Sequence, residues 1–211
     1  MLRRKPCVLA VGLLLLSTGC ASTAAAAHRS HLPTDPVTVT DPGAPTITGA
    51  GYDLHAAGDV SQAASGDAWA GALATLNRYL QLGILTPLRS GGPAGPLAPY
   101  FTAEAGGRVS SPGAERAAFV DEGLPPATVI RQDKAVATLA GLAGADGVMA
   151  VVTARLDLRV TAQIDGSPVV IVRTGELVLV PEGGRWKIDA FDISVKRDSA
   201  EVGTTTTSRS P

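Results

Sequence analysis

Apolar and polar residues alternate strictly along the second half of the chain. From residue 148 to 164 every second position is apolar, and from Thr153 onward the positions between them carry Thr, Arg, Asp and Gln. This period of two predicts one long β-strand with one face in the core and the other in water. Two further runs follow after turns rich in Gly and Pro, at residues 169–180 and 185–197.

The last of these runs changes phase part-way along. Apolar side chains occupy even positions as far as Ile188 and odd positions from Phe191 to Val195. One extra residue in a strand produces a β-bulge, which we therefore expect near Ala190. With an earlier strand predicted over residues 135–142, the pattern describes a four-stranded antiparallel meander.

The first half of the chain has the period of a helix. Apolar side chains recur at steps of three and four and share one helical face: Trp69, Leu73, Leu76, Leu80 and Ile84. Helix-start patterns lie at residues 59–62 and 65–67, and Thr86-Pro87 is expected to end the helix. Shorter helices are predicted over residues 97–105 and 112–120. Helices followed by an antiparallel meander define an α+β fold.

The first residues of the chain have the organisation of an export signal. Residues 1–6 are basic, residues 7–16 are apolar, and the run closes with the small residues 17–19 and Cys20. The apolar run is too short to span a membrane, which needs about 20 residues.

This leader, ending in Leu-Ser-Thr-Gly-Cys, resembles a bacterial lipoprotein signal, in which the cysteine thiol is diacylglycerated and the chain is cut before it. The resemblance implies a signal peptide over residues 1–19 and lipid attachment at Cys20. It places the mature chain on the extracytoplasmic face of the bacterial cell membrane. An ordinary cleaved signal, cut near Ala21 or Ala24, is the alternative.

Segments of low apolar content flank the predicted domain. Residues 20–58 are rich in Ala, Pro, Thr and Gly without a core-forming period, so we expect a disordered tether. Residues 199–211 are rich in Thr and Ser and are expected to form a disordered tail. The globular α+β domain is therefore predicted over residues 59–198.

Charge and cysteine content narrow the class of partner. The formal net charge is −1. Loss of the leader lowers it to about −4, because the leader holds three basic residues and no acid. Without a basic stripe the chain does not fit a nucleic-acid-binding protein, and membrane attachment would depend on the acyl chains. Cys7 leaves with the leader and Cys20 is acylated, so no disulfide is expected.

Two segments resemble nuclear-transport-factor-2-like domains. Residues 184–195 contain the end of a turn, then Trp186, then a strand in which apolar residues alternate with polar ones. The closing strand of that family has the same order. Residues 100–105, soon after a long amphipathic helix, fit its second helix. The resemblance covers about residues 60–198 and implies N-terminal helices packed on a curved antiparallel sheet of about four to six strands, which forms a cone. Many small actinobacterial lipoproteins look similar.

Members of this superfamily include enzymes, binding proteins and docking domains, so the fold does not select a function. Its enzymes use an acid or His base in the cone, and the residues here that could take part are Tyr79, Tyr100, Asp121, Glu122 and Asp133. Next to Gly123 and Pro125, the pair Asp121-Glu122 is expected to be solvated, and Tyr100 to be a core aromatic. No catalytic residue is assigned.

The residues that could line a pocket in such a cone are Trp186, Tyr100 and Asp121. No cofactor and no metal are expected, because His28 and His31 lie in the tether without further ligands nearby.

The water-facing side of the long strand carries charges of alternating sign. Arg155, Asp157 and Arg159 are expected to pair across strands with Glu176, Lys187 or Asp189. The same face could instead dock a protein partner or a second copy of the chain.

These observations favour a membrane-anchored, non-enzymatic binding or envelope-assembly module. One alternative is a carrier that holds a hydrophobic small ligand in the cone, and another is a small isomerase or dehydratase.

Overall fold

The computed structural model describes residues 45–199. The predicted signal peptide at residues 1–19, lipid attachment at Cys20 and most of the predicted tail lie outside the described residues. The elements, in chain order, are β1 (Thr48–Ala56), α1 (Gln62–Tyr79), a π-helical turn η1 (Leu80–Leu85), α2 (Thr86–Ser90), a 3₁₀ turn η2 (Ala98–Tyr100), α3 (Ala103–Ser110), α4 (Ala114–Phe119), β2 (Val129–Ala143), β3 (Met149–Ile164), β4 (Ser167–Glu182) and β5 (Arg185–Ser199).

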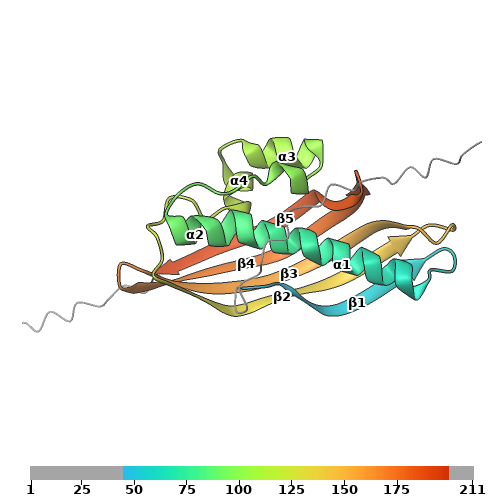
Figure 1. Ribbon diagram of the computed structural model, residues 1–211, viewed down its shortest axis with the longest axis horizontal. Coiled ribbons are helices and arrows are strands. Elements are labelled where there is room, and N and C mark those ends of the chain that lie inside the picture. Colours follow the sequence, from blue (N-terminus) through green and yellow to red (C-terminus); the bar gives the residue numbers. More distant parts are fainter. Residues whose placement is uncertain (1–44, 200–211) are drawn as a thin grey trace, which may run out of the picture. The chain divides into compact units, whose positions relative to one another are not determined.

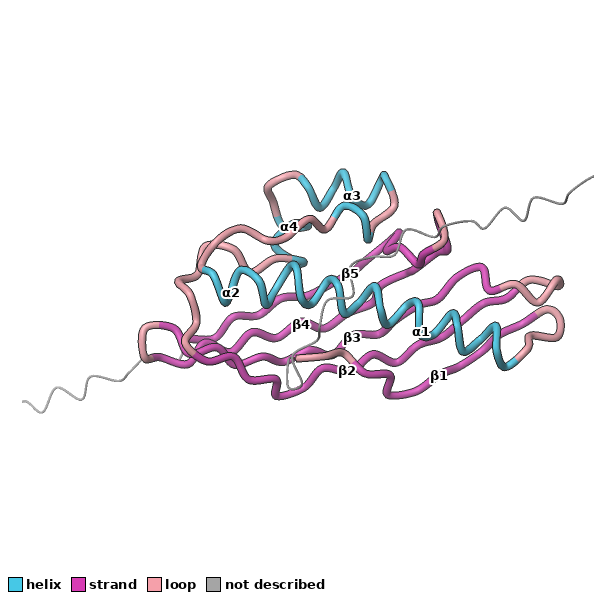
Figure 2. The backbone as a smooth tube through the Cα atoms, viewed as in Figure 1, coloured by secondary structure: helices cyan, strands magenta, loops and turns pink. Residues whose placement is uncertain are grey.

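The strands form one open, mixed sheet in the order β1-β2-β3-β4-β5 (Figure 1). Strands β2 to β5 make the predicted antiparallel meander, and β1 adds to it in parallel with β2. The helices lie on one face of this sheet, as Figure 2 also shows. The α+β class is therefore confirmed.

Strand β1 corrects the predicted tether, which was expected to continue to residue 58. Its sequence, TGAGYDLHA, has no alternation of buried and exposed positions. What holds it is the backbone pairing with β2, from Thr48 opposite Val136 to Ala56 opposite Ala143. Just before the strand, Asn77 of α1 accepts a hydrogen bond from the Ile47 amide (2.7 Å) and donates to the Ile47 carbonyl (3.0 Å).

The alternation in β3 holds from Val152 onward, where every even position to Ile164 is buried. It fails at its first positions, since Met149 is buried and Val148 is 60% exposed. The cause is a register shift in the β2–β3 pairing between Leu142 and Ala143, which changes which side of the strand faces the helices.

The predicted bulge in β5 is confirmed. Val178 pairs with Ala190 and Leu179 pairs with Ile188, so Asp189 is the extra residue. Opposite the segment beyond the bulge, Gly175 has φ 152°, and a Cβ there would lie 1.9 Å from the Asp192 carbonyl oxygen. Glycine is therefore required where β4 and β5 approach each other at this point.

The helical segment differs from its prediction at two places. Thr86-Pro87 does not end the first helix, because the π-helical turn η1 carries it into α2, and Gly91 (φ 64°) then ends it. Proline is accommodated because the Leu82 carbonyl, five residues back in the π-helical pattern, accepts its hydrogen bond from the Gly95 amide (2.9 Å) instead. The helix expected over residues 97–105 is instead η2 followed by α3, which continues through Gly106 and Gly107.

The core lies between the sheet and the helices. Leu76, Leu80 and Ile84 are fully buried, as their spacing predicts, in one cluster with the inward residues of β3 and β4. An aromatic group closes the cluster beneath α3 and α4, where Phe119 makes edge-to-face contacts with three rings: Tyr79, Phe101 and Phe191.

Candidate functional site

A charged cluster is buried where the loop after α4 meets the sheet. Arg173 and Asp121 have fully buried side chains, and Arg173 Nη1 donates to Asp121 Oδ2 (2.5 Å). The alternation of β4 places Arg173 on its inward face, in line with the buried Ile171 and Leu177. Asp121 is held over it by its own amide, which donates to the Gly83 carbonyl (3.0 Å).

Every nitrogen of the Arg173 guanidinium has an acceptor. Besides Asp121, it donates through Nε to the Ala118 carbonyl (3.0 Å) and through Nη2 to the Val120 carbonyl (3.2 Å). Arg197 of β5 completes the cluster, donating to Asp121 Oδ1 (2.8 Å) and to the Val120 carbonyl (3.0 Å). An acceptor at every nitrogen of the guanidinium helps such a buried ion pair to be tolerated.

Tyr79 lies beside this cluster, and its hydroxyl approaches the Ala118 carbonyl (3.5 Å). Burial raises the pKa of Tyr79 to about 12, although Arg173 opposes the shift. For Arg173, burial works against the charge, but Tyr79 and Asp121 outweigh it and the pKa is raised. The tyrosine therefore stays protonated and the arginine charged at neutral pH, which suits a structural tie rather than proton transfer.

The expectation that Asp121 and Glu122 form a solvated acid pair is wrong. Asp121 is buried, and Glu122 is half-buried between the Ala94 amide (2.7 Å) and Arg116 (2.6 Å). The Ala94 hydrogen bond, followed by Arg116, lowers the pKa of Glu122. Both acids fasten the loop 120–122 to neighbouring segments.

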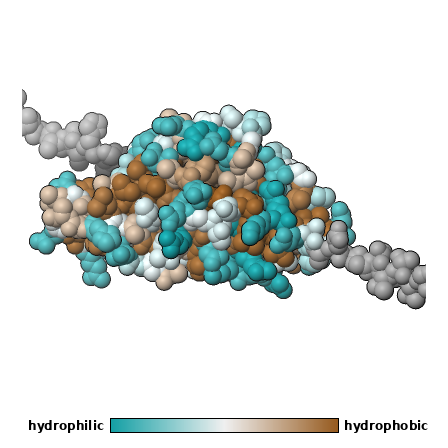
Figure 3. Space-filling view, turned by 180° about the vertical axis from the view of Figure 1, so that it is seen from behind, coloured by the Kyte–Doolittle hydropathy of each residue, from teal (hydrophilic) through white to brown (hydrophobic). Residues whose placement is uncertain are grey.

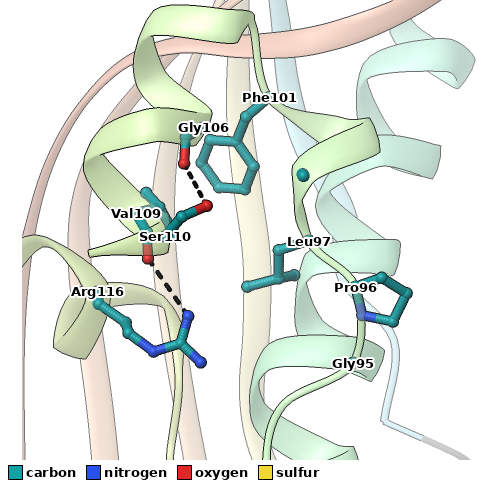
Figure 4. A pocket seen from close by; sticks show the side chains of 9 residues that line it. Gly95, Pro96, Leu97, Phe101, Gly106, Val109, Ser110 and Arg116 are labelled. Carbon is teal, nitrogen blue, oxygen red and sulfur yellow. Dashed lines mark hydrogen bonds between the residues drawn. The ribbon is translucent and has the colours of Figure 1, made fainter. Parts of the chain in front are cut away.

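A cavity of about 220 Å³ lies between α3 and the loop before η2 (Figure 4). Its lining is mainly backbone and apolar side chains: Gly95, Pro96, Leu97, Ala98, Phe101, Gly106, Val109, Ser110 and Arg116. The polar side chains there already have partners, since Ser110 donates to the Gly106 carbonyl (2.7 Å) and Arg116 binds Glu122. The volume is below the roughly 300–1,000 Å³ of typical ligand pockets.

The residues expected to line a pocket are not brought together. Asp121 belongs to the buried ion cluster, and half-buried Trp186 lies against Gly71 of α1. Tyr100 is half-buried at the end of η2, in agreement with its expected core role. None of the three is among the residues that line the cavity beneath α3.

The sheet face opposite the helices, which we call the outer face, carries cross-strand ion pairs. Arg155 of β3 pairs with Glu176 of β4 (2.8 Å), as predicted, and Lys134 of β2 pairs with Asp157. Of the three predicted alternatives Glu176 is thus the partner found, whereas Lys187 binds Glu182 (2.5 Å) within its own hairpin and Asp189 is the extra residue of the bulge.

Asp133 also belongs to the outer face, not to the interior. Thr161 donates to it (2.5 Å) and Arg131 pairs with it (2.8 Å). The Thr161 hydrogen bond and then Arg131 and Arg159 lower the pKa of this carboxyl.

A shallow hollow of about 320 Å³ lies among these cross-strand ion pairs of the outer face. It is lined by Arg155, Leu156, Asp157, Thr174, Gly175 and Glu176. Half-buried valines of β4 flank it at residues 170, 172, 178 and 180. Seen from the side opposite the helices, hydrophobic surface lies interspersed with hydrophilic groups (Figure 3).

Comparisons with models of known protein families, with curated proteins and with solved structures found no match to this chain. Among residues 45–199, no helix is long and apolar enough to cross a membrane. In the same part of the chain, no three His, Cys, Asp or Glu side chains gather where they could hold a metal ion. His28 and His31 lie outside the described residues, and exposed His55 lies 3.3 Å from Asp53.

Proposed function

We propose that this chain is a bacterial lipoprotein, anchored to the extracytoplasmic face of the cell membrane through acyl chains on Cys20. Its domain is a non-enzymatic binding or envelope-assembly module that docks a protein partner on the outer face of the sheet. The leader supports the anchor, and the geometry of the described residues supports the docking module.

The outer face is the observation that carries the docking proposal. The helices lie on the other side of the sheet (Figure 1). The cross-strand ion pairs, the half-buried valines of β4 and the shallow hollow on the outer face are therefore open to a partner. By contrast, the buried ionisable groups Arg173 and Asp121 bind each other and nearby carbonyls. The charged groups that a partner could reach therefore lie on the outer face, whereas the charged groups of the interior already bind one another.

We also propose that the fold is a variant of the nuclear-transport-factor-2-like cone. A long helix against the sheet and Trp186 at the head of the closing strand support it. The open sheet edge and the parallel β1 are departures from the expected antiparallel cone. A carrier role receives less support, because the cavity beneath α3 is about 220 Å³ and too small for an acyl chain or sterol-like body.

The anchor is tested with Cys20→Ala in the full chain. Wild-type protein should partition into detergent and incorporate labelled fatty acid, because two or more acyl chains give stable membrane binding. The variant should do neither. Unchanged detergent partitioning of the variant would reject the lipoprotein assignment while leaving the docking proposal to its own test.

Docking is tested by reversing Arg155 and Arg159 to Glu together. Thermal stability should change by no more than about 1 kcal/mol, because exposed pairs contribute little. Capture of a partner from envelope extract should be lost, since like charges facing each other in an interface are costly. A matched control reverses exposed Arg89 of α2 and Arg108 of α3, of which Arg108 pairs with Glu115 as Arg155 pairs with Glu176, with the same change in net charge. Equal capture by wild type, variant and control would remove the outer face as a docking site.

A further inference from the structure

The two edges of the open sheet differ in regularity. In β1, a register irregularity between Gly49 and Gly51 interrupts a strand of nine residues. In β5, residues 190–199 pair with β4 in unbroken register beyond the bulge. A long, regular edge strand is a template on which another strand can pair.

The bulge divides β5 into a part whose carbonyls already have partners and a part that is open. Before it, the carbonyls of Trp186 and Ile188 accept hydrogen bonds from Thr75 Oγ1 (2.5 Å) and the Thr102 amide (3.0 Å). Beyond it, the alternation of an antiparallel ladder turns the peptide groups of Phe191, Ile193 and Val195 toward the edge. No described residue outside β4 hydrogen-bonds to the peptide groups of residues 190–199.

The side chains of this open part have a self-complementary order. Asp192, Ser194 and Lys196 are exposed on the outer face, and neither charged residue forms an ion pair within the described part of the chain. Ile193 and Val195 are half-buried on the inner face at the margin of the core. Read in the opposite direction, the order Asp-Ser-Lys places each charge opposite its counter-charge.

We propose that the chain forms a homodimer by antiparallel pairing of β5 with β5 of a second copy, about a two-fold axis at Ser194. Asp192 of each copy then faces Lys196 of the other, and Ile193 faces Val195, so both faces of the new ladder are matched. This proposal concerns the edge and does not rest on docking at the outer face.

Other registers are disfavoured by charge. An axis at Val195 would set Asp192 opposite Asp198, and an axis at Asp192 or Lys196 would set identical charges opposite each other. An axis at Ile193 would set Asp192 opposite Ser194, with no counter-charge. Because like charges directly opposite destabilise a strand pair, the axis at Ser194 is selected.

Disulfide trapping of the full chain tests the axis. Residues at a non-hydrogen-bonded antiparallel position have Cα atoms about 4.5 Å apart, within the roughly 4.4–6.8 Å that a disulfide spans. Ser194→Cys should therefore give a covalent dimer on mild oxidation. Thr174→Cys, also exposed and directly opposite Ser194 on the adjacent strand β4, is the matched control, and wild type controls for Cys7 and Cys20. Failure of Ser194→Cys to cross-link above both controls would overturn the register.

Charge exchange tests the pairing in sedimentation velocity experiments on the full chain. Wild type should dimerise. Asp192→Lys and Lys196→Asp should each weaken association at least about tenfold, because each places like charges opposite each other twice. The double variant should restore it. A monomeric wild type, or a double variant as weak as the single ones, would overturn the proposal. Melting curves check that the variants fold.

Discussion

Replacing Arg173 with Met tests whether the buried ion cluster ties the loop after α4 to the sheet. Methionine keeps an apolar stem of similar length but removes the donors to the Ala118 and Val120 carbonyls and the partner of Asp121. Removing one member of a buried ion pair typically costs about 3–5 kcal/mol. Since Arg197 still binds Asp121 Oδ1, we expect the lower end, about 3 kcal/mol of unfolding free energy.

Urea unfolding of the full chain, followed by tryptophan fluorescence, measures this loss. Arg197→Met is the matched control, because its side chain is 36% exposed and it shares two of the three acceptors of Arg173, namely Asp121 and the Val120 carbonyl. It should cost about 1 kcal/mol. If Arg173→Met lost less than about 1 kcal/mol, or no more than Arg197→Met, the cluster would not be the buried tie described above.

Three further predictions concern single residues. The pKa of Tyr79 is about 12 in the folded protein against 10.0 in the unfolded chain, so the folded state retains the proton. Stability should fall by about 2–3 kcal/mol as the pH rises through this window, and urea midpoints of Tyr79→Phe should lack that part of the fall. Gly175→Ala should lower the melting temperature by the equivalent of at least about 3 kcal/mol, because its Cβ would strike the Asp192 carbonyl; an unchanged melting curve would mean that the strands can separate there. Trp186→Ala should cost about 2 kcal/mol in urea unfolding, below the roughly 3–5 kcal/mol of a fully buried aromatic, because the ring is half-buried against Gly71.

The sequence predicted those elements in which the order of apolar and polar residues shows which side chains are buried. The alternation of β3 and the phase change in β5 identified the strands and the bulge, because burial of one face constrains every second residue. Strand β1 escaped prediction because backbone pairing with β2 holds it, and main-chain hydrogen bonds leave no side-chain pattern. An edge strand with few buried side chains is therefore hard to distinguish from a linker.

The buried ion cluster was missed for a different reason. Asp121 stands next to Gly and Pro residues, where acids are usually solvated, and its partner Arg173 is 52 residues away in the sequence. Yet one signal was available. Arg173 occupies an inward position of β4, in phase with Ile171 and Leu177, and a charge in that phase requires a buried counter-charge. The sequence thus indicates that a partner exists without identifying it.

The charges of β5 fall into two groups that the proposed dimer treats differently. Arg197 lies on the inner face and binds Asp121 and the Val120 carbonyl of its own chain. Asp192 and Lys196 lie exposed on the outer face, where β4 sets Glu176 opposite Asp192 and Val172 opposite Lys196, so no counter-charge stands directly opposite either within the chain. Arg173→Met, which removes the other arginine of that cluster from buried β4, should therefore lower stability and leave association unchanged, whereas Asp192→Lys should weaken association and leave stability nearly unchanged. If both variants changed the two quantities in parallel, dimerisation would be a consequence of folding stability and not of strand pairing at Ser194.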